Sequence, residues 1–95
     1  MEATGSVEGA KDQHEVQFLG LSTCVWCRRT RQFLEKASVS FTFTYIDLLD
    51  GERKEAALDT LGRWNPRQSY PTIVIDGSRV IVGYKPEELR EALNL

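Results

Sequence analysis

The strongest constraint on this chain comes from two short motifs, Cys24-Val25-Trp26-Cys27 and, further along, Tyr70-Pro71-Thr72. The two cysteines are the only ones among 95 residues. They stand where a short apolar run ends and a helical pattern begins. A CxxC at such a strand-to-helix junction is typical of a redox-active dithiol. The sequence therefore indicates the chemistry of the chain more clearly than its substrate.

Composition and charge limit the partners of such a chain. Its length predicts one domain, and 41% hydrophobic with 27% charged residues is ordinary for a globular protein. A formal net charge of -2 argues against nucleic acid, which requires a basic face. No apolar run approaches the length of a membrane span. We therefore expect neither nucleic acid nor a membrane as a partner, and we expect a monomer.

The first 14 residues differ in character from the rest. Residues 1–14 have neither the basic start nor the apolar stretch of a secretory signal, and they are rich in Gly, Ser and Glu. We predict a disordered tail at 1–14 and a folded domain at 15–95. A cytoplasmic location is the corresponding expectation. Because thiols are kept reduced there, a single CxxC is expected to be catalytic or metal-binding rather than structural.

The apolar pattern predicts a small α/β fold. Runs rich in β-branched and aromatic residues predict four strands, at 15–20, 41–46, 72–75 and 79–82. Helical spacing predicts three helices, at 25–37, at 51–62 after a capping Asp50, and from Pro86 onward. The first crossover should be right-handed and parallel, and Asp76-Gly77 is typical of a hairpin turn. The order β-α-β-α-β-β-α thus predicts a mixed four-stranded sheet flanked by three helices.

The placement of the two thiols assigns them different roles. Thiol-disulfide exchange needs an accessible thiolate with a second thiol close behind it. Cys24 stands at the N-terminal edge of a helix, where free N–H groups and the helix dipole favour an anion. Arg28 and Arg29 add positive charge one turn further on. We predict Cys24 as the attacking thiol and Cys27, one turn inward, as the resolving thiol.

Other uses of the cysteines compete with this interpretation. A structural disulfide across two residues closes too small a loop to stabilise much. A zinc site needs four ligands, and His14 is the only histidine available to join the two cysteines. A metal or iron–sulfur site shared between two chains, with Cys24 bridging them, stays open.

Together the motifs resemble the glutaredoxins, and most closely the glutaredoxin-like redoxins of the NrdH type. The resemblance rests on residues 23–27, Tyr70-Pro71-Thr72, the Asp-Gly hairpin and Gly83-Tyr84-Lys85-Pro86, and it covers residues 15–95. It implies a thioredoxin-like fold, thiol-disulfide oxidoreductase activity on protein disulfides, and a cis Tyr70–Pro71 bond. The backbone at Tyr70 would then face the dithiol and could pair with an extended peptide or with glutathione.

The same resemblance bears on the electron donor. Arg67 matches a position that is often basic and could meet a glutathione carboxylate. However, Leu21 replaces a common basic residue, and the Gly-Gly and acidic pair of classical glutaredoxins is absent. Gly83 and Tyr84 belong to a pattern similar to redoxins that a flavoprotein disulfide reductase reduces. The implied donor is therefore such a reductase or glutathione, with no tightly bound cofactor and no metal.

An aromatic rim for docking partner proteins is the last prediction. Trp26 between the cysteines, Tyr70 and Tyr84 would form it, although Tyr84 could instead pack on the last helix. The candidate catalytic residues are thus Cys24 and Cys27, and the candidate substrate-binding residues are Trp26, Arg67, Tyr70, Pro71, Gly83 and Tyr84.

Overall fold

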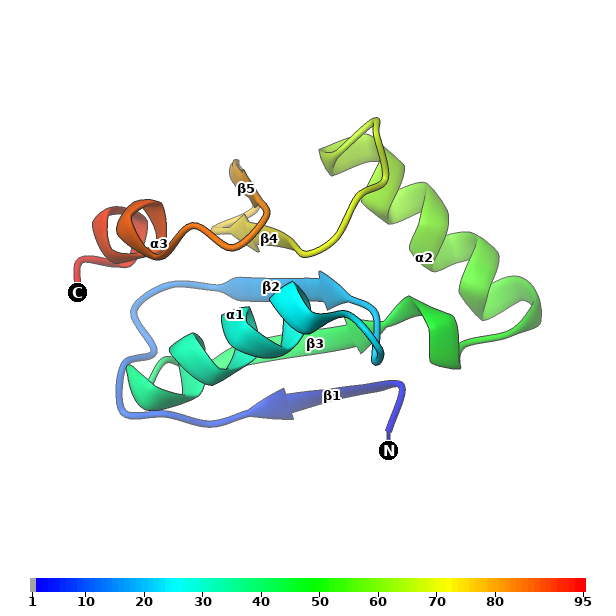
Figure 1. Ribbon diagram of the computed structural model, residues 1–95. Coiled ribbons are helices and arrows are strands. Elements are labelled where there is room, and N and C mark those ends of the chain that lie inside the picture. Colours follow the sequence, from blue (N-terminus) through cyan, green and yellow to red (C-terminus); the bar gives the residue numbers. More distant parts are fainter. Residues whose placement is uncertain (1) are drawn as a thin grey trace.

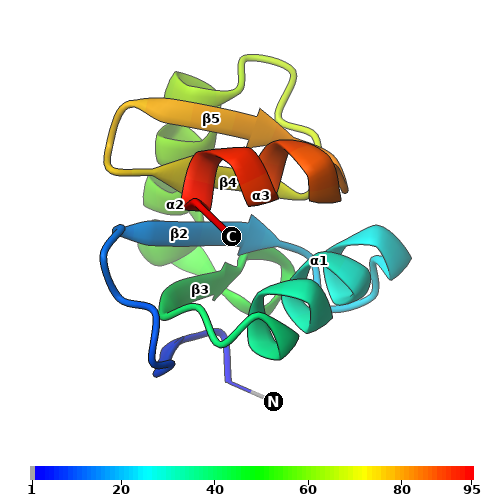
Figure 2. The same ribbon diagram turned by 90° about the vertical axis from the view of Figure 1, so that its left-hand side faces the viewer.

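A computed structural model of the chain describes residues 2–95 and places three helices around one mixed sheet (Figure 1). The elements are β1 (Thr4–Val7), β2 (Val16–Gly20), α1 (Val25–Lys36), β3 (Phe41–Tyr45), a 3-10 turn η1 (Ile46–Leu48), α2 (Gly51–Trp64), β4 (Thr72–Ile75), β5 (Arg79–Val82) and α3 (Pro86–Leu93). Within the described residues the strands follow the order β1-β3-β2-β4-β5. Figure 2 shows α1 and α3 on one face of the sheet and α2 on the opposite face.

Strand β2 is the centre of the sheet and sets the position of the cysteines. It runs parallel to β3, with Phe18 opposite Phe43, and antiparallel to β4, with Phe18 opposite Ile73. Strands β4 and β5 form the expected antiparallel hairpin. The predicted mixed sheet and its helices are confirmed, and the carboxyl end of the central strand leads directly into the loop before Cys24.

Two apolar cores lie on the two faces of the sheet because successive residues of β2 point to opposite sides. Phe18 is fully buried in the larger core, under α1 and α3, where its ring meets Tyr45 edge-on. Leu19 points the other way, into a smaller core with Leu61 of α2. Cys27 belongs to the larger core. The larger apolar core of the domain thus also buries one of the two thiols.

The predicted disordered tail requires correction, because it contains a fifth strand. Residues 4–7 form β1, which pairs antiparallel with the outer edge of β3. Further along, the side chain of Ser40 accepts a hydrogen bond from the N–H of Gly9 and donates one to its carbonyl. The edge of β3 would otherwise expose unpaired backbone groups. This tertiary pairing orders a segment whose own sequence has little strand propensity.

The helices follow the predicted positions with small differences at their ends. Helix α2 continues past Gly62 to Trp64, and the N–H of Asn65 still bonds the carbonyl of Leu61. Asp50 occupies the N-cap position of α2, but its side chain makes no capping hydrogen bond. Pro86 begins α3 as predicted. Of the helices in residues 2–95, none combines the length and apolar character needed to cross a membrane.

We expect Gly9→Ala to detach the N-terminal segment from the domain. A Cβ at this position would clash with the carbonyl oxygen of Ser38, which is backbone and cannot rotate away. Overpacking of this kind costs about 1–3 kcal/mol. Urea denaturation should show the loss in the free energy of unfolding, and limited proteolysis should show faster cleavage near the substitution. Glu8→Ala, at an exposed neighbouring position, should change neither measurement.

Candidate active site

Cys24 is the N-cap residue of α1. Its backbone is extended, and its sulfur accepts a hydrogen bond from the N–H of Cys27 at 3.2 Å. The turn before it is closed by a bond from the N–H of Cys24 to the carbonyl of Leu21. The thiol is partly exposed. It therefore lies where unpaired N–H groups of a first helical turn can stabilise a sulfur anion.

Cys27 lies directly behind, with 1% of its surface exposed. Burial, together with the hydrogen bond and charge of Cys24, raises the pKa of Cys27 to about 12. Its thiol therefore keeps its proton at neutral pH while the pair is reduced. Both cysteines are free thiols in the structure. One accessible and one buried sulfur in a single helical turn are what stepwise exchange requires.

Asp47 is a site residue that none of the sequence motifs indicates. It follows β3 and accepts hydrogen bonds from both the N–H and the hydroxyl of Ser22, at 2.8 Å for the N–H. Burial opposes its ionisation, but the bonds from Ser22 lower the pKa of Asp47. Its charge also contributes to the raised pKa values of Cys27 and Tyr70. The carboxylate therefore anchors the loop before Cys24 and adds negative charge near the dithiol.

We expect Asp47→Asn to lower the pKa of Cys27. The substitution removes a negative charge that disfavours the Cys27 thiolate, so that thiol should deprotonate at lower pH. Ultraviolet absorbance of the thiolate, recorded through a pH titration of the reduced protein, measures the change. Ser22→Ala loses a hydrogen bond to Asp47 but keeps the charge, and so separates the two effects. An unchanged or higher pKa in the Asp47→Asn protein would contradict the assignment.

The Tyr70–Pro71 bond is cis, as the family resemblance implies. The carbonyl of Pro71 accepts the N–H of Gly83 at 2.8 Å, which joins this loop to the segment after β5. The buried side chain of Asn65 donates to the carbonyl and hydroxyl of Ser69 and to the hydroxyl of Thr72. The loop is thus fixed by hydrogen bonds at both ends.

Three predicted aromatic residues meet beside the dithiol. The rings of Trp26 and Tyr84 stack, with centroids 5.9 Å apart and 21° between the planes. Together with Tyr70, Gly83 and Lys85 they line a pocket of about 310 Å³, called the aromatic pocket below. Trp26 is 55% exposed. Gly83 has φ of +90°, a conformation that favours glycine.

The structure brings together all the predicted site residues except Arg67. That side chain is exposed on the loop after α2 and is not among the residues that line the aromatic pocket. His14 lies at the far end of β2 from the cysteines, bonded to Asp76 and Asn94. In residues 2–95, no three His, Cys, Asp or Glu side chains gather as a metal site would require.

A helix that begins at a CxxC, follows the central strand of a mixed sheet and faces a cis-proline loop defines the thioredoxin-fold class of thiol proteins. Within that class the chain belongs to the glutaredoxin family, because the Glutaredoxin family model matches residues 16–80. The resemblance found in the motifs is thereby confirmed, and so is the thioredoxin-like fold.

Solved structures agree with this assignment. A glutaredoxin from Methanosarcina mazei is 39% identical, with a TM-score of 0.90 over 99% of this chain and 90% of its own. The methanoredoxin of Methanosarcina acetivorans is also 39% identical, with a TM-score of 0.87 over 92% of this chain and 90% of its own. The NrdH-redoxin of Escherichia coli, at 19% identity and a TM-score of 0.66 over 81% of this chain and 92% of its own, shares the fold.

Proposed function

We propose that this protein reduces disulfide bonds through its two cysteines. The Cys24 thiolate attacks one sulfur of a substrate disulfide, forms a mixed disulfide and releases the other substrate sulfur as a thiolate that takes up a proton. Cys27 then loses its proton and attacks the Cys24 sulfur, which releases the second substrate thiol. The substrate gains two electrons, and the protein ends with a Cys24–Cys27 disulfide.

The difference in exposure between the two sulfurs carries this proposal. Cys24 is accessible at the helix N-terminus and is bonded to an N–H of the first turn. Cys27 is buried one turn behind it, and the raised pKa of Cys27 keeps it protonated until a substrate changes its surroundings. Formation of the mixed disulfide replaces the Cys24 charge with a neutral sulfur, which removes one cause of the raised pKa of Cys27. The buried thiol thus becomes a better nucleophile when it is needed.

The proposed substrates are disulfides in proteins, held against the aromatic pocket. Trp26 and the half-buried side chains of Tyr70 and Tyr84 offer apolar area next to Cys24, of the kind that anchors protein partners. A flavoprotein disulfide reductase is the favoured electron donor, and glutathione is the alternative. Arg67 is exposed and is not among the residues that line this pocket, so its guanidinium does not offer a glutathione carboxylate a contact there.

Regeneration of the oxidised protein tests the proposal. In one arm the protein is supplied with NADPH and a thioredoxin reductase; in the other, with NADPH, glutathione reductase and glutathione. The readout is NADPH consumed when insulin disulfides are reduced. Turnover in the first arm is the expected result. Turnover only in the second would make glutathione the donor, and Arg67→Gln would be the next variant to assay. If chemically reduced protein fails to reduce insulin at all, the proposal is wrong.

A further inference from the structure

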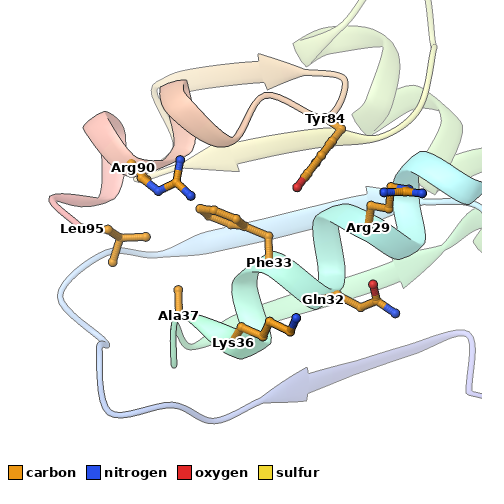
Figure 3. Close-up of a pocket in the computed structure, with 8 residues that line it drawn as sticks. All are labelled: Arg29, Gln32, Phe33, Lys36, Ala37, Tyr84, Arg90 and Leu95. Atoms are coloured by element: carbon orange, nitrogen blue, oxygen red, sulfur yellow. The ribbon is translucent and has the colours of Figure 1, made fainter.

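A second surface depression, larger than the aromatic pocket, runs between α1 and α3 (Figure 3). It measures about 480 Å³, and we call it the basic groove after Arg29, Lys36 and Arg90, which line it with Phe33 and Tyr84. Arg29, Phe33 and Lys36 lie three or four positions apart and so share one face of α1. Figure 3 shows Tyr84 and Arg90 pointing toward that face from the segment after β5 and from α3.

The charge in the groove is locally positive on a chain whose net charge is -2. Arg90 lies over the ring of Phe33 at 5.2 Å and pairs with the exposed Glu87. Within residues 2–95, Arg29 and Lys36 have no carboxylate within ion-pair distance. Arg29 and Lys36 thus keep their full positive charge, whereas Arg90 shares its charge with Glu87. The groove can therefore attract a negatively charged group.

The groove adjoins the active site. The guanidinium of Arg29 lies over the ring of Trp26 at 5.5 Å, and Trp26 stands between the two cysteines. Tyr84 lines both the aromatic pocket and the basic groove. A substrate chain whose disulfide lies at Cys24 can therefore extend from the aromatic pocket into the basic groove.

We infer that the basic groove binds an acidic segment of the protein that carries the disulfide, an inference that rests on the function proposed above. Arg29 and Lys36 are 5 and 12 residues beyond Cys24, or roughly 8 and 18 Å along the helix axis. An extended peptide advances about 3.3 Å per residue. The preferred substrates therefore carry Asp or Glu about two and about five positions from the reacting cysteine.

The test uses three synthetic peptides, each with one cysteine joined to thionitrobenzoate as a mixed disulfide. They differ only two to five positions from the cysteine, on both sides, where one has Glu, one Gln and one Lys. The rate at which reduced protein releases the coloured thionitrobenzoate is measured at low ionic strength. The Glu peptide should react about tenfold faster than the Gln peptide, although the net charge of the protein would by itself favour Lys. Raising the ionic strength from about 0.01 M to about 1 M shortens the screening length from roughly 30 to 3 Å and should remove the difference.

Variants of the protein test whether the preference for the Glu peptide comes from the basic groove. The double variant Arg29→Gln with Lys36→Gln should lose most of the preference for Glu over Gln. Arg53→Gln with Arg63→Gln removes the same charge from exposed positions on α2 and should keep that preference. Lys36→Gln alone should weaken the preference for Glu over Gln by less than the double variant does.

The possible failures are distinguishable. If none of the three peptides reacts, the proposed function itself fails. If the Gln peptide reacts but Glu gives no advantage over Lys, only the inference about the groove fails. It also fails if the double variant Arg29→Gln with Lys36→Gln keeps the full preference for Glu over Gln.

Discussion

Cys24→Ser should abolish disulfide reduction while leaving the fold intact. A hydroxyl is a far weaker nucleophile than a thiolate, and losing the attacking group of a catalytic unit typically costs a thousandfold or more, roughly. The fold should survive because serine is a favoured N-cap residue and its oxygen can accept the N–H that the Cys24 sulfur now accepts. Steady-state reduction of insulin by the variant, with either donor, should be indistinguishable from the reaction without protein.

The variant also tests which sulfur attacks first. The Cys27 thiol is still present, but it is 1% exposed and its pKa is raised by burial. If the variant still forms mixed disulfides, Cys27 must reach substrates directly, and the assignment of the nucleophile is wrong. Circular dichroism and the urea midpoint, compared with those of the unchanged chain, show that a lost activity is not a lost fold.

The central part of the fold could be predicted because each element carries its own local pattern. Residues 41–45 alternate between the two faces of the sheet, and the apolar positions of α1 recur with helical spacing. Strand β1 could not be predicted in this way. Only Val7 is apolar among its four residues, and the strand exists because the edge of β3 offers it hydrogen bonds. The local sequence of a segment does not show that a strand distant in the chain will pair with it.

The candidate site likewise contains residues that the sequence could predict and residues that it could not. The cysteines and the proline loop are short motifs whose spacing is readable, and the stacking of Trp26 on Tyr84 follows from placing both beside that dithiol. Asp47 was missed because its role depends on Ser22, 25 residues away and in contact only after β2 and β3 pair in parallel. The basic groove likewise joins α1 to α3, and a run of arginines in one helix does not indicate which element lies opposite.

Cys27→Ser should convert the protein from a catalyst into a trap for its substrates. The Cys24 thiolate would still form the mixed disulfide, but the thiol that resolves it from within would be gone. A positioned neighbouring group reacts as if at an effective concentration far above that of any thiol in solution. Turnover of protein disulfides should therefore fall on the order of a hundredfold. Mass spectrometry of the reaction mixture should find the variant carrying one covalently attached substrate chain, removable by dithiothreitol.

Two controls decide what the trapping means. Because serine places a hydroxyl in the buried position of Cys27, Cys27→Ala serves as a second variant without that polar group. Both should trap the same adducts, and the double variant with Cys24→Ser should trap none. If neither single variant accumulates a mixed disulfide while both still turn over at the normal rate, resolution must come from an external thiol. The protein would then work through Cys24 alone, and the buried thiol would serve the core and not the reaction.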